Sequence, residues 1–360
     1  RGQWAVMGDG TWLLYGANGY TGRLIAEEAV RRGMRPVLAG RREAAVRPLA
    51  ERLRLPYRIF GLDDMPAERL ADEMGAVDVV LLAAGPFSAT SGPVVEACLA
   101  TGTHYLDITG EIDVFESVFR RHAAARSSGC VLLPGVGFDV VPTDCLAAAL
   151  SASLPGARLL ELAWAGGMRP TSGTARTTIE ALPDGGAVRE EGSIRREPIG
   201  RRTLLVPFRD RSRLAMSVPW GDVATAYHST GIPDIVVYTA VPPVMARAVR
   251  LGRTLLPLLR GGGAQRALHA AAGRWFRGPG PEQRRSGRTH LWGRVRDAGG
   301  EERSATLETP EPYHLTVLTA LEAVRLVVDG QVEPGAQTPS LAFGADFITS
   351  IPGCDISPGA

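Results

Sequence analysis

The sequence predicts an α/β protein: a Rossmann-type, doubly wound parallel sheet followed by a second α+β domain. Up to about residue 150, short apolar runs alternate with segments of helical periodicity, which is typical of parallel strands with crossover helices. The first apolar run leads directly into regularly spaced glycines, and from about residue 156 the pattern changes to alternating strands and a hairpin. We therefore predict a Rossmann domain at 7–150, an α+β domain for substrate binding or dimerisation at 151–330, and a C-terminal segment at 331–360 that packs back on the first domain.

The stretch from Trp12 to Val30 predicts a strand, a tight turn and a helix, because an apolar run precedes the glycines and apolar residues follow them at helical spacing. Glycine lets a backbone approach a ligand closely, and a helix N-terminus presents unpaired N–H groups to phosphate. The turn is therefore predicted to bind a dinucleotide pyrophosphate through Gly16, Ala17, Asn18, Gly19, Tyr20, Thr21 and Gly22. Because the spacing is GxxGxxG and not the standard GxGxxG, a glycine-rich turn without a ligand is the alternative.

The second predicted strand, 36–39, ends in Gly40, Arg41 and Arg42. An NAD site normally carries an acidic residue about twenty residues after the turn, whereas an arginine there accommodates the 2′-phosphate of NADP. We therefore expect NADP(H) as the cofactor, held by Arg41 with help from Arg42. The alternative is an exposed arginine in an arginine-rich chain.

Further strands are predicted at 57–60, 77–84, 104–108 and 130–133, separated by helices at 43–53, 64–73, 92–101 and 114–127. Ligands of open α/β sheets lie beyond the carboxyl ends of the strands. Asp63 is therefore the candidate for the adenine edge, although the Asp63–Asp64 pair can equally supply a helix N-cap. The loop after the fourth strand is predicted to pass the nicotinamide ribose and pyrophosphate, or else to be a purely structural turn; it comprises Ala84, Gly85, Pro86 and Phe87.

The second part of the chain predicts strands at 159–164, 193–195, 203–206 and 235–241, a hairpin at 288–296 and 303–307, and helices at 172–182 and 312–329. The stretch 244–276 interleaves leucine with arginine and predicts two helices. We interpret it as a cap over an apolar pocket or a dimer interface in preference to a segment that contacts a membrane surface.

The composition excludes several classes of function. A net charge of +2 creates no global field for nucleic acid, and the absence of lysine excludes a Schiff-base mechanism. The four cysteines lie far apart without metal-ligand spacing, so we expect free thiols in a reducing compartment and no metal. The sequence shows neither a signal peptide nor an apolar run of eighteen residues, and we expect a cytoplasmic protein.

Four motifs together carry a family resemblance: GANGYTG at 16–22, AGPF at 84–87, GTHYLDITGE at 102–111 and GFDVVPTD at 137–144. With these the chain resembles the saccharopine dehydrogenase-like oxidoreductases, and among them the bacterial members related to trans-acting enoyl reductases. The resemblance implies a two-domain NADP(H) oxidoreductase, but it leaves the substrate open. The family name refers to reduction of an imine, whereas the enoyl reductase branch reduces carbon–carbon double bonds of carrier-bound acyl chains. This chain departs from the enoyl reductase pattern at Val140, where a serine is usual.

Hydride transfer to a double bond also requires a proton source. The candidate catalytic residues are Tyr227, His228 and Asp139. The first two rank higher because the polar stretch around them is rich in residues unsuited to a surface loop, although hydrogen-bonded core positions are the alternative for both. Asp139 could instead position the nicotinamide carboxamide or cap a helix. Candidate substrate contacts are Tyr105, Thr174 and Arg176, with a plain N-cap as the alternative for the last two.

The sequence therefore predicts an NADPH-dependent oxidoreductase that transfers hydride to a C=C (enoyl) or C=N bond. The expected substrate is small and largely apolar, or an acyl group on a carrier, and the expected assembly is a homodimer. The alternative is an NADP-binding protein without catalysis, such as a sensor or a lipid-associated scaffold. Binding of NADPH without turnover would favour that alternative.

Overall fold

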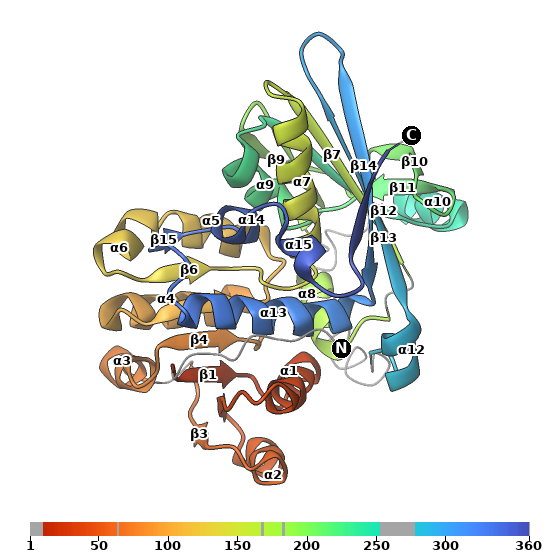
Figure 1. Ribbon diagram of the computed structural model, residues 1–360. Helices are drawn as coiled ribbons and strands as arrows, with labels where there is room; N and C mark the ends of the chain where they lie inside the picture. The colour runs from red at the N-terminus through yellow and green to blue at the C-terminus, as the bar shows by residue number, and fades with distance from the viewer. Residues whose placement is uncertain (1–9, 63–64, 167–168, 182–183, 253–277, 360) are drawn as a thin grey trace. The chain divides into compact units, whose positions relative to one another are not determined.

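The computed structural model describes residues 10–62, 65–166, 169–181, 184–252 and 278–359. The chain divides into two compact units (Figure 1). The first unit contains the residues up to Asp139 together with Leu315–Phe343, and the second contains Val140–His314 and the residues from Gly344 onward. Each unit is built around one large β-sheet.

The sheet of the first unit has seven strands, and all its described pairings are parallel. Its strands are β1 (Trp12–Tyr15), β2 (Val37–Gly40), β3 (Tyr57–Ile59), β4 (Val79–Leu82), β5 (His104–Asp107), β6 (Val131–Leu133) and β15 (Gly335–Ala336). The order β15-β6-β5-β4-β1-β2-β3 is the doubly wound order with one short strand added beside β6. The predicted Rossmann-type sheet is confirmed.

Helices cover both faces of this sheet (Figure 1). One face packs against α1 (Tyr20–Arg31), α2 (Glu43–Leu53) and α13 (Pro312–Val328), and the other against α3 (Ala67–Gly75), α4 (Phe87–Thr101), α5 (Ile112–Phe119) and α6 (His122–Ser127). Strand β1 is apolar throughout because its side chains enter both cores. Trp12 and Leu14 belong to the core on one face of the sheet, and Leu13 and Tyr15 belong to the core on the other face. A parallel strand buried on both faces has no solvent-facing position for polar residues.

Two helices of the first unit differ from their predicted ranges. Helix α4 begins at Phe87 and continues through Pro93, whereas the Gly92–Pro93 pair predicted a start at 92. The core contacts of Val94, Val95 and Cys98 stabilise the helix despite the proline, so tertiary packing overrides local propensity. The helix predicted at 114–127 is two helices, α5 and α6.

The division of the chain also differs from the predicted boundaries. Helix α7 (Val141–Ser153) belongs to the second unit, although the Rossmann domain was predicted to extend to 150. Residues 315–330 belong to the first unit. The predicted C-terminal segment is divided, because β15 pairs with β6 in the first unit and β16 (Asp355–Pro358) pairs with β14 in the second.

The second unit contains a nine-stranded sheet with the order β10-β11-β12-β7-β13-β14-β16 and a hairpin, β8–β9, attached to β12. Its other strands are β7 (Leu159–Ala165), β8 (Gly186–Glu190), β9 (Ser193–Glu197), β10 (Thr203–Pro207), β11 (Ser212–Ser217), β12 (Asp234–Ala240), β13 (Arg288–Arg296) and β14 (Glu302–Pro310). The structure confirms the predicted hairpin as β13–β14. Strands β8, β11 and β16 were missed by the sequence pattern.

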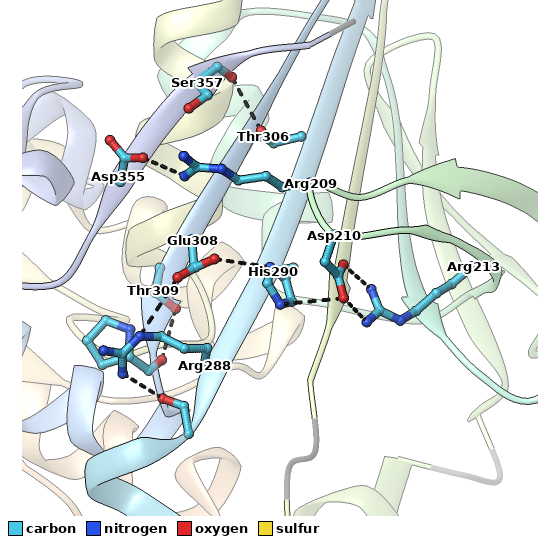
Figure 2. Close-up of polar contacts among 12 residues, drawn as sticks. Arg209, Asp210, Arg213, Arg288, His290, Thr306, Glu308, Thr309, Asp355 and Ser357 are labelled. Atoms are coloured by element: carbon cyan, nitrogen blue, oxygen red, sulfur yellow. Dashed lines mark hydrogen bonds and ion pairs between the residues drawn. The ribbon is translucent and has the colours of Figure 1, made fainter.

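The two faces of the second sheet differ in character. One face packs closely on α7: a Cβ atom on Gly293 would lie 2.7 Å from Leu150 Cδ1. On the other face, the turn between β10 and β11 contacts strands far away in the sheet order (Figure 2). Arg209 forms an ion pair with Asp355 of β16, and an Asp210 carboxylate oxygen lies 3.8 Å from Nε2 of His290 on β13. These contacts fix the turn across the sheet.

The remaining helices of the described residues are α8 (Ser172–Ala181), α9 (Asp222–Thr230), α10 (Pro243–Gly252), α12 (Pro281–Ser286), α14 (Pro339–Phe343) and α15 (Phe347–Ser350). Helix α9 occupies the stretch around Tyr227, where the sequence analysis predicted no helix. Helix α10 covers the start of the predicted 244–276 segment, and 253–277 lie outside the described residues. Within the described ranges, no helix has the length and apolar character needed to span a membrane.

Candidate functional site

The three glycines after β1 have three different structural roles. Gly16 has a φ of +86°, and its N–H donates to the Ala39 carbonyl at 2.9 Å, so it forms the tight turn. A Cβ atom on Gly22 would lie 2.3 Å from the Gly16 carbonyl oxygen, so Gly22 permits close packing of α1 on β1. Gly19 is the N-cap of α1, and apart from its chain neighbours the Gly16 oxygen is the sole atom of the described residues within 4 Å of its Cβ position. These are the turn, packing and ligand-approach roles of a dinucleotide fingerprint.

The start of α1 suits a phosphate group. Its first turn, Tyr20 to Gly22, carries no acidic side chain, and no side chain caps the helix. The helix dipole and the backbone N–H groups therefore favour an anion at this end. The β4–α4 loop lies against the same turn, since a Cβ atom on Gly16 would come within 2.9 Å of the Ala84 Cβ. The structure thus brings together two of the predicted cofactor segments, 16–22 and 84–87.

The end of β2 lies beside this turn as well. A Cβ atom on Gly40 would be 3.1 Å from Asn18 Oδ1. The exposed Arg41 and Arg42 follow directly, and Arg42 is the N-cap residue of α2. The backbone that carries both arginine side chains therefore lies close to the glycine turn, as a 2′-phosphate site requires. Asp63, the adenine candidate, lies outside the described residues.

Replacing Gly22 with alanine is expected to disrupt this turn. The new methyl group would lie 2.3 Å from a backbone oxygen that belongs to the turn itself, so the helix must move away from β1. We expect a loss of about 2–3 kcal/mol in the free energy of unfolding and at least tenfold weaker NADPH binding. Chemical denaturation and NADPH fluorescence titration measure the two effects. Gly92→Ala is the matched control, because no atom of the described residues outside the backbone of its own helix lies within 4 Å of that Cβ position. Equal effects of both variants would contradict the assignment.

Glu111 was not singled out by sequence, yet it fixes the start of α4. Its two carboxylate oxygens accept hydrogen bonds from the N–H groups of Phe87 and Ser88, at 2.8 and 2.7 Å. An internal carboxylate therefore already neutralises the α4 N-terminus, and α1 provides the anion site. The acidic residue of the loop at 109–111 was the sequence signal available for this contact.

Asp107, at the end of β5, connects the loop that follows β5 with the loop that follows β6. One carboxylate oxygen accepts from the N–H groups of Thr109 (2.9 Å) and Gly135 (2.8 Å), and the other from the Tyr105 hydroxyl (2.6 Å). Burial raises the Asp107 pKa to about 6, although these bonds oppose the shift. Tyr105 itself is completely buried in the core of the first unit, and its hydroxyl is engaged by Asp107. Tyr105 therefore exposes no atom that a substrate could contact.

Asp139 follows the loop after β6 and packs against the loop after β5. A Cβ atom on Gly110 would lie 2.5 Å from Asp139 Oδ2, so the glycine makes room for this carboxyl group. The side chain is half-buried, and desolvation raises its pKa to about 7. A carboxyl with this pKa is partly protonated at neutral pH and can act as a general acid.

Tyr227 and His228 lie on α9 in the second unit. The Arg189 guanidinium carbon is 4.3 Å from the centroid of the Tyr227 ring, and the His228 ring is 6.0 Å from it. Arg189 is buried and donates to the backbone oxygens of Val223 and Gly192. The half-buried Tyr227 ring thus stacks on a buried guanidinium group. A catalytic role for Tyr227 or His228 stays a prediction.

Thr174 belongs to a hydroxyl network at the start of α8. Thr171 Oγ1 accepts from the Thr174 N–H at 3.2 Å, so Thr171 caps the helix in place of the predicted Ser172. The Thr174 hydroxyl lies 2.9 Å from the Tyr313 hydroxyl, which also accepts from the Thr171 N–H at 2.8 Å. The side chain of Arg176 lies outside the described residues. Substrate binding by Thr174 and Arg176 stays a prediction.

Glu311 precedes α13, and its stability contribution should depend on pH. Its Oε2 accepts from the N–H groups of Tyr313 and His314, while Oε1 is buried and has no hydrogen-bond partner among the described residues. Burial raises the Glu311 pKa to about 7. This pKa is higher than that of a glutamate in the unfolded chain. The contribution of Glu311 to the free energy of unfolding is therefore fully present below about pH 4 and is lost as the pH rises through 7.

The difference in stability between Glu311→Gln and the wild type should therefore depend on pH. Compared with the wild type, we expect the variant to gain about 2–3 kcal/mol between pH 5 and pH 8. Urea denaturation at both pH values measures this difference. The exposed Glu282 supplies the control Glu282→Gln, which should show no such gain. A pH-independent difference for Glu311→Gln would contradict the raised pKa.

Among the described residues, no group of His, Cys, Asp or Glu side chains is arranged to hold a metal ion, and the four cysteines are free thiols. The sheet order, the three glycine roles and the basic end of β2 together define a Rossmann-fold unit of the dinucleotide-binding class. Residues 12–133 match the family model of the saccharopine dehydrogenase NADP binding domain. This part of the chain is therefore similar to that domain, and NADP(H) is the cofactor that fits it.

The chain is also similar to two mycobacterial relatives in sequence and to one solved structure in fold. A putative trans-acting enoyl reductase of Mycobacterium tuberculosis is 29% identical over 265 residues, covering 68% of this chain and 61% of the relative. A trans-acting enoyl reductase of Mycobacterium leprae is 35% identical over 138 residues, 37% of this chain and 33% of the relative. The chain thus spans about three-fifths of the length of the first relative. Apo saccharopine dehydrogenase (L-Glu forming) from Saccharomyces cerevisiae has the same fold, with a TM-score of 0.66 at 11% identity over 98% of this chain and all of the other.

Proposed function

We propose that the protein is an NADPH-dependent reductase that transfers hydride to a C=C (enoyl) or C=N bond of a largely apolar or acyl substrate. The observation that carries this proposal is Asp139. It is a half-buried carboxyl group with a pKa of about 7. It follows β6 at the carboxyl edge of the sheet, in the unit that matches an NADP-binding domain. Reduction of a double bond needs a proton for the atom that does not receive the hydride.

Each group of the first unit would have a defined task. Bound NADPH supplies the hydride. The α1 N-terminus binds the pyrophosphate, and Arg41 pairs with the 2′-phosphate. Asp107 and Glu111 hold the loops after β5 and β6 and the start of α4 in position. Protonated Asp139 donates its proton to the substrate atom adjacent to the one that accepts hydride, becomes a carboxylate, and is reprotonated from solvent for the next turnover.

The enoyl substrate is the first choice between the two bonds. Both mycobacterial relatives carry the name enoyl reductase, and the match to the first of them extends over 68% of this chain.

NADPH oxidation at 340 nm with two substrates tests the proposal. Crotonyl-N-acetylcysteamine represents an enoyl thioester, and a cyclic imine represents the C=N class. We expect turnover of the thioester, and NADPH binding that intrinsic fluorescence detects without substrate. NADPH binding without turnover of either substrate would support the non-catalytic alternative, whereas absence of NADPH binding would overturn the assignment at its base.

A further inference from the structure

Helix α10, whose ten residues are all described, presents apolar side chains to solvent. Val244 is 76% exposed, Met245 51% and Leu251 81%, and none of the ten residues is buried. Val244, Ala248 and Leu251 are spaced i, i+4 and i+7, so they form one stripe along the helix. Val249 points to another side and lies 3.4 Å from the Cβ position of Gly200. The stripe therefore faces away from the neighbouring strands.

The charged residues of α10 itself are both arginines. Arg247 and Arg250 lie on α10 beside the apolar residues and are exposed. In the sequence from 235 to 281 there are seven arginines and no aspartate or glutamate. A short helix with an apolar face and flanking arginines complements a surface that combines anionic groups with an apolar interior. The guanidinium groups can stay at headgroup level while the aliphatic side chains enter the acyl region.

Other occupants fit less well. A cap over a pocket in its own unit would bury the stripe, yet the stripe is exposed. Two copies of the chain that meet through this face would bring the arginines of both copies together, which is unfavourable. A ten-residue helix also falls short of the ~800 Å² per partner that a stable protein interface buries.

We propose that the α10 surface, made of Val244, Met245, Arg247, Ala248, Arg250 and Leu251, binds the surface of an anionic membrane. This reverses the order of preference drawn from sequence, because the structure exposes the apolar side of the helix. The protein lies on the bilayer at this helix and does not cross it there. The surface is separate from the NADP site and requires no catalytic residue.

Co-sedimentation of the full chain with sucrose-loaded vesicles tests the proposal. We expect strong binding to POPC:POPG (7:3) vesicles at 0.1 M NaCl, at least tenfold weaker binding to POPC alone, and loss of binding at 0.5 M NaCl. Leu251→Glu should weaken binding at least tenfold. Arg247→Gln/Arg250→Gln should weaken it about 25-fold, since each arginine near an anionic surface contributes about fivefold.

Matched controls remove the same groups elsewhere. Leu341→Glu changes a leucine that is 49% exposed in the first unit, and Arg69→Gln/Arg285→Gln removes two exposed arginines from other helices. Both controls should change vesicle binding less than twofold, and every variant should keep wild-type NADPH affinity. Absence of binding to the anionic vesicles, or equal losses in test and control variants, would overturn the proposal. Conversion of a dimer to a monomer by Leu251→Glu, seen by light scattering without any vesicle binding, would overturn it too by assigning the face to a second copy.

Discussion

Asp139→Asn is expected to lower kcat for reduction of the double bond by about 10²–10⁴-fold, the usual contribution of a general acid. An amide has nearly the shape of the carboxyl group but cannot release a proton. The side chain does not reach the pyrophosphate turn at 16–22 in this assignment, so we expect NADPH affinity to change less than threefold. Stopped-flow measurement of NADPH oxidation and fluorescence titration separate these two quantities.

The pH dependence of the wild type gives a second readout for the same residue. Because desolvation raises the Asp139 pKa to about 7, the acid is protonated below pH 7 and kcat should fall as pH rises above that value. The decline should disappear in Asp139→Asn. Asp72→Asn, on the exposed surface of α3, is the control and should retain both kcat and the pH profile. A fully active Asp139→Asn enzyme would move the search for the proton donor to Tyr227 and His228.

Arg41→Asp is expected to weaken NADPH binding about 100-fold. The change removes a charge-assisted pair with the 2′-phosphate and places a carboxylate against it. NADH lacks this phosphate, so its affinity should change less than threefold, and the preference for NADPH over NADH should fall by nearly the whole factor. Calorimetric titration with both nucleotides gives the two dissociation constants.

The control for Arg41→Asp is Arg69→Asp, an equal charge reversal at an exposed position of α3. It should leave both affinities within twofold of the wild type. If Arg41→Asp lowered NADPH and NADH affinity equally, the guanidinium group would act on the pyrophosphate or on folding and not on the 2′-phosphate. Unchanged affinities would leave Arg42 as the group to replace.

The first unit could be predicted from sequence because its signals are local. Each strand of the parallel sheet is a continuous apolar run, and Gly16, Gly19 and Gly22 mark the turn that starts the first crossover. The second sheet was less predictable, because β8, β11 and β16 are short, β11 and β16 are partly exposed, and the pairing of β11 and β16 depends on contacts with distant segments. Residues 315–343 return to the first unit for the same kind of reason: their partners are far away in the sequence.

The candidate site shows the same limit. The glycines and Arg41 carry their function in their residue type and spacing, so sequence alone identifies them. The raised pKa of Asp139 depends on its burial beside Gly110, a contact between two different loops. Glu111 likewise acts on the N-terminus of a helix that begins at Phe87, far from it in the chain. Such roles follow from folding and have no separate signature in the sequence.

The discontinuous first unit determines how it could be isolated as a fragment. A protein that ended at Asp139 would lack α13, whose Val317, Leu321 and Val324 complete one side of the core, and would lack β15 at the edge of the sheet. Such a truncated protein should aggregate, because it would expose apolar surface that the intact chain buries. A soluble nucleotide-binding fragment needs residues 315–343 joined by a short engineered connection after residue 139.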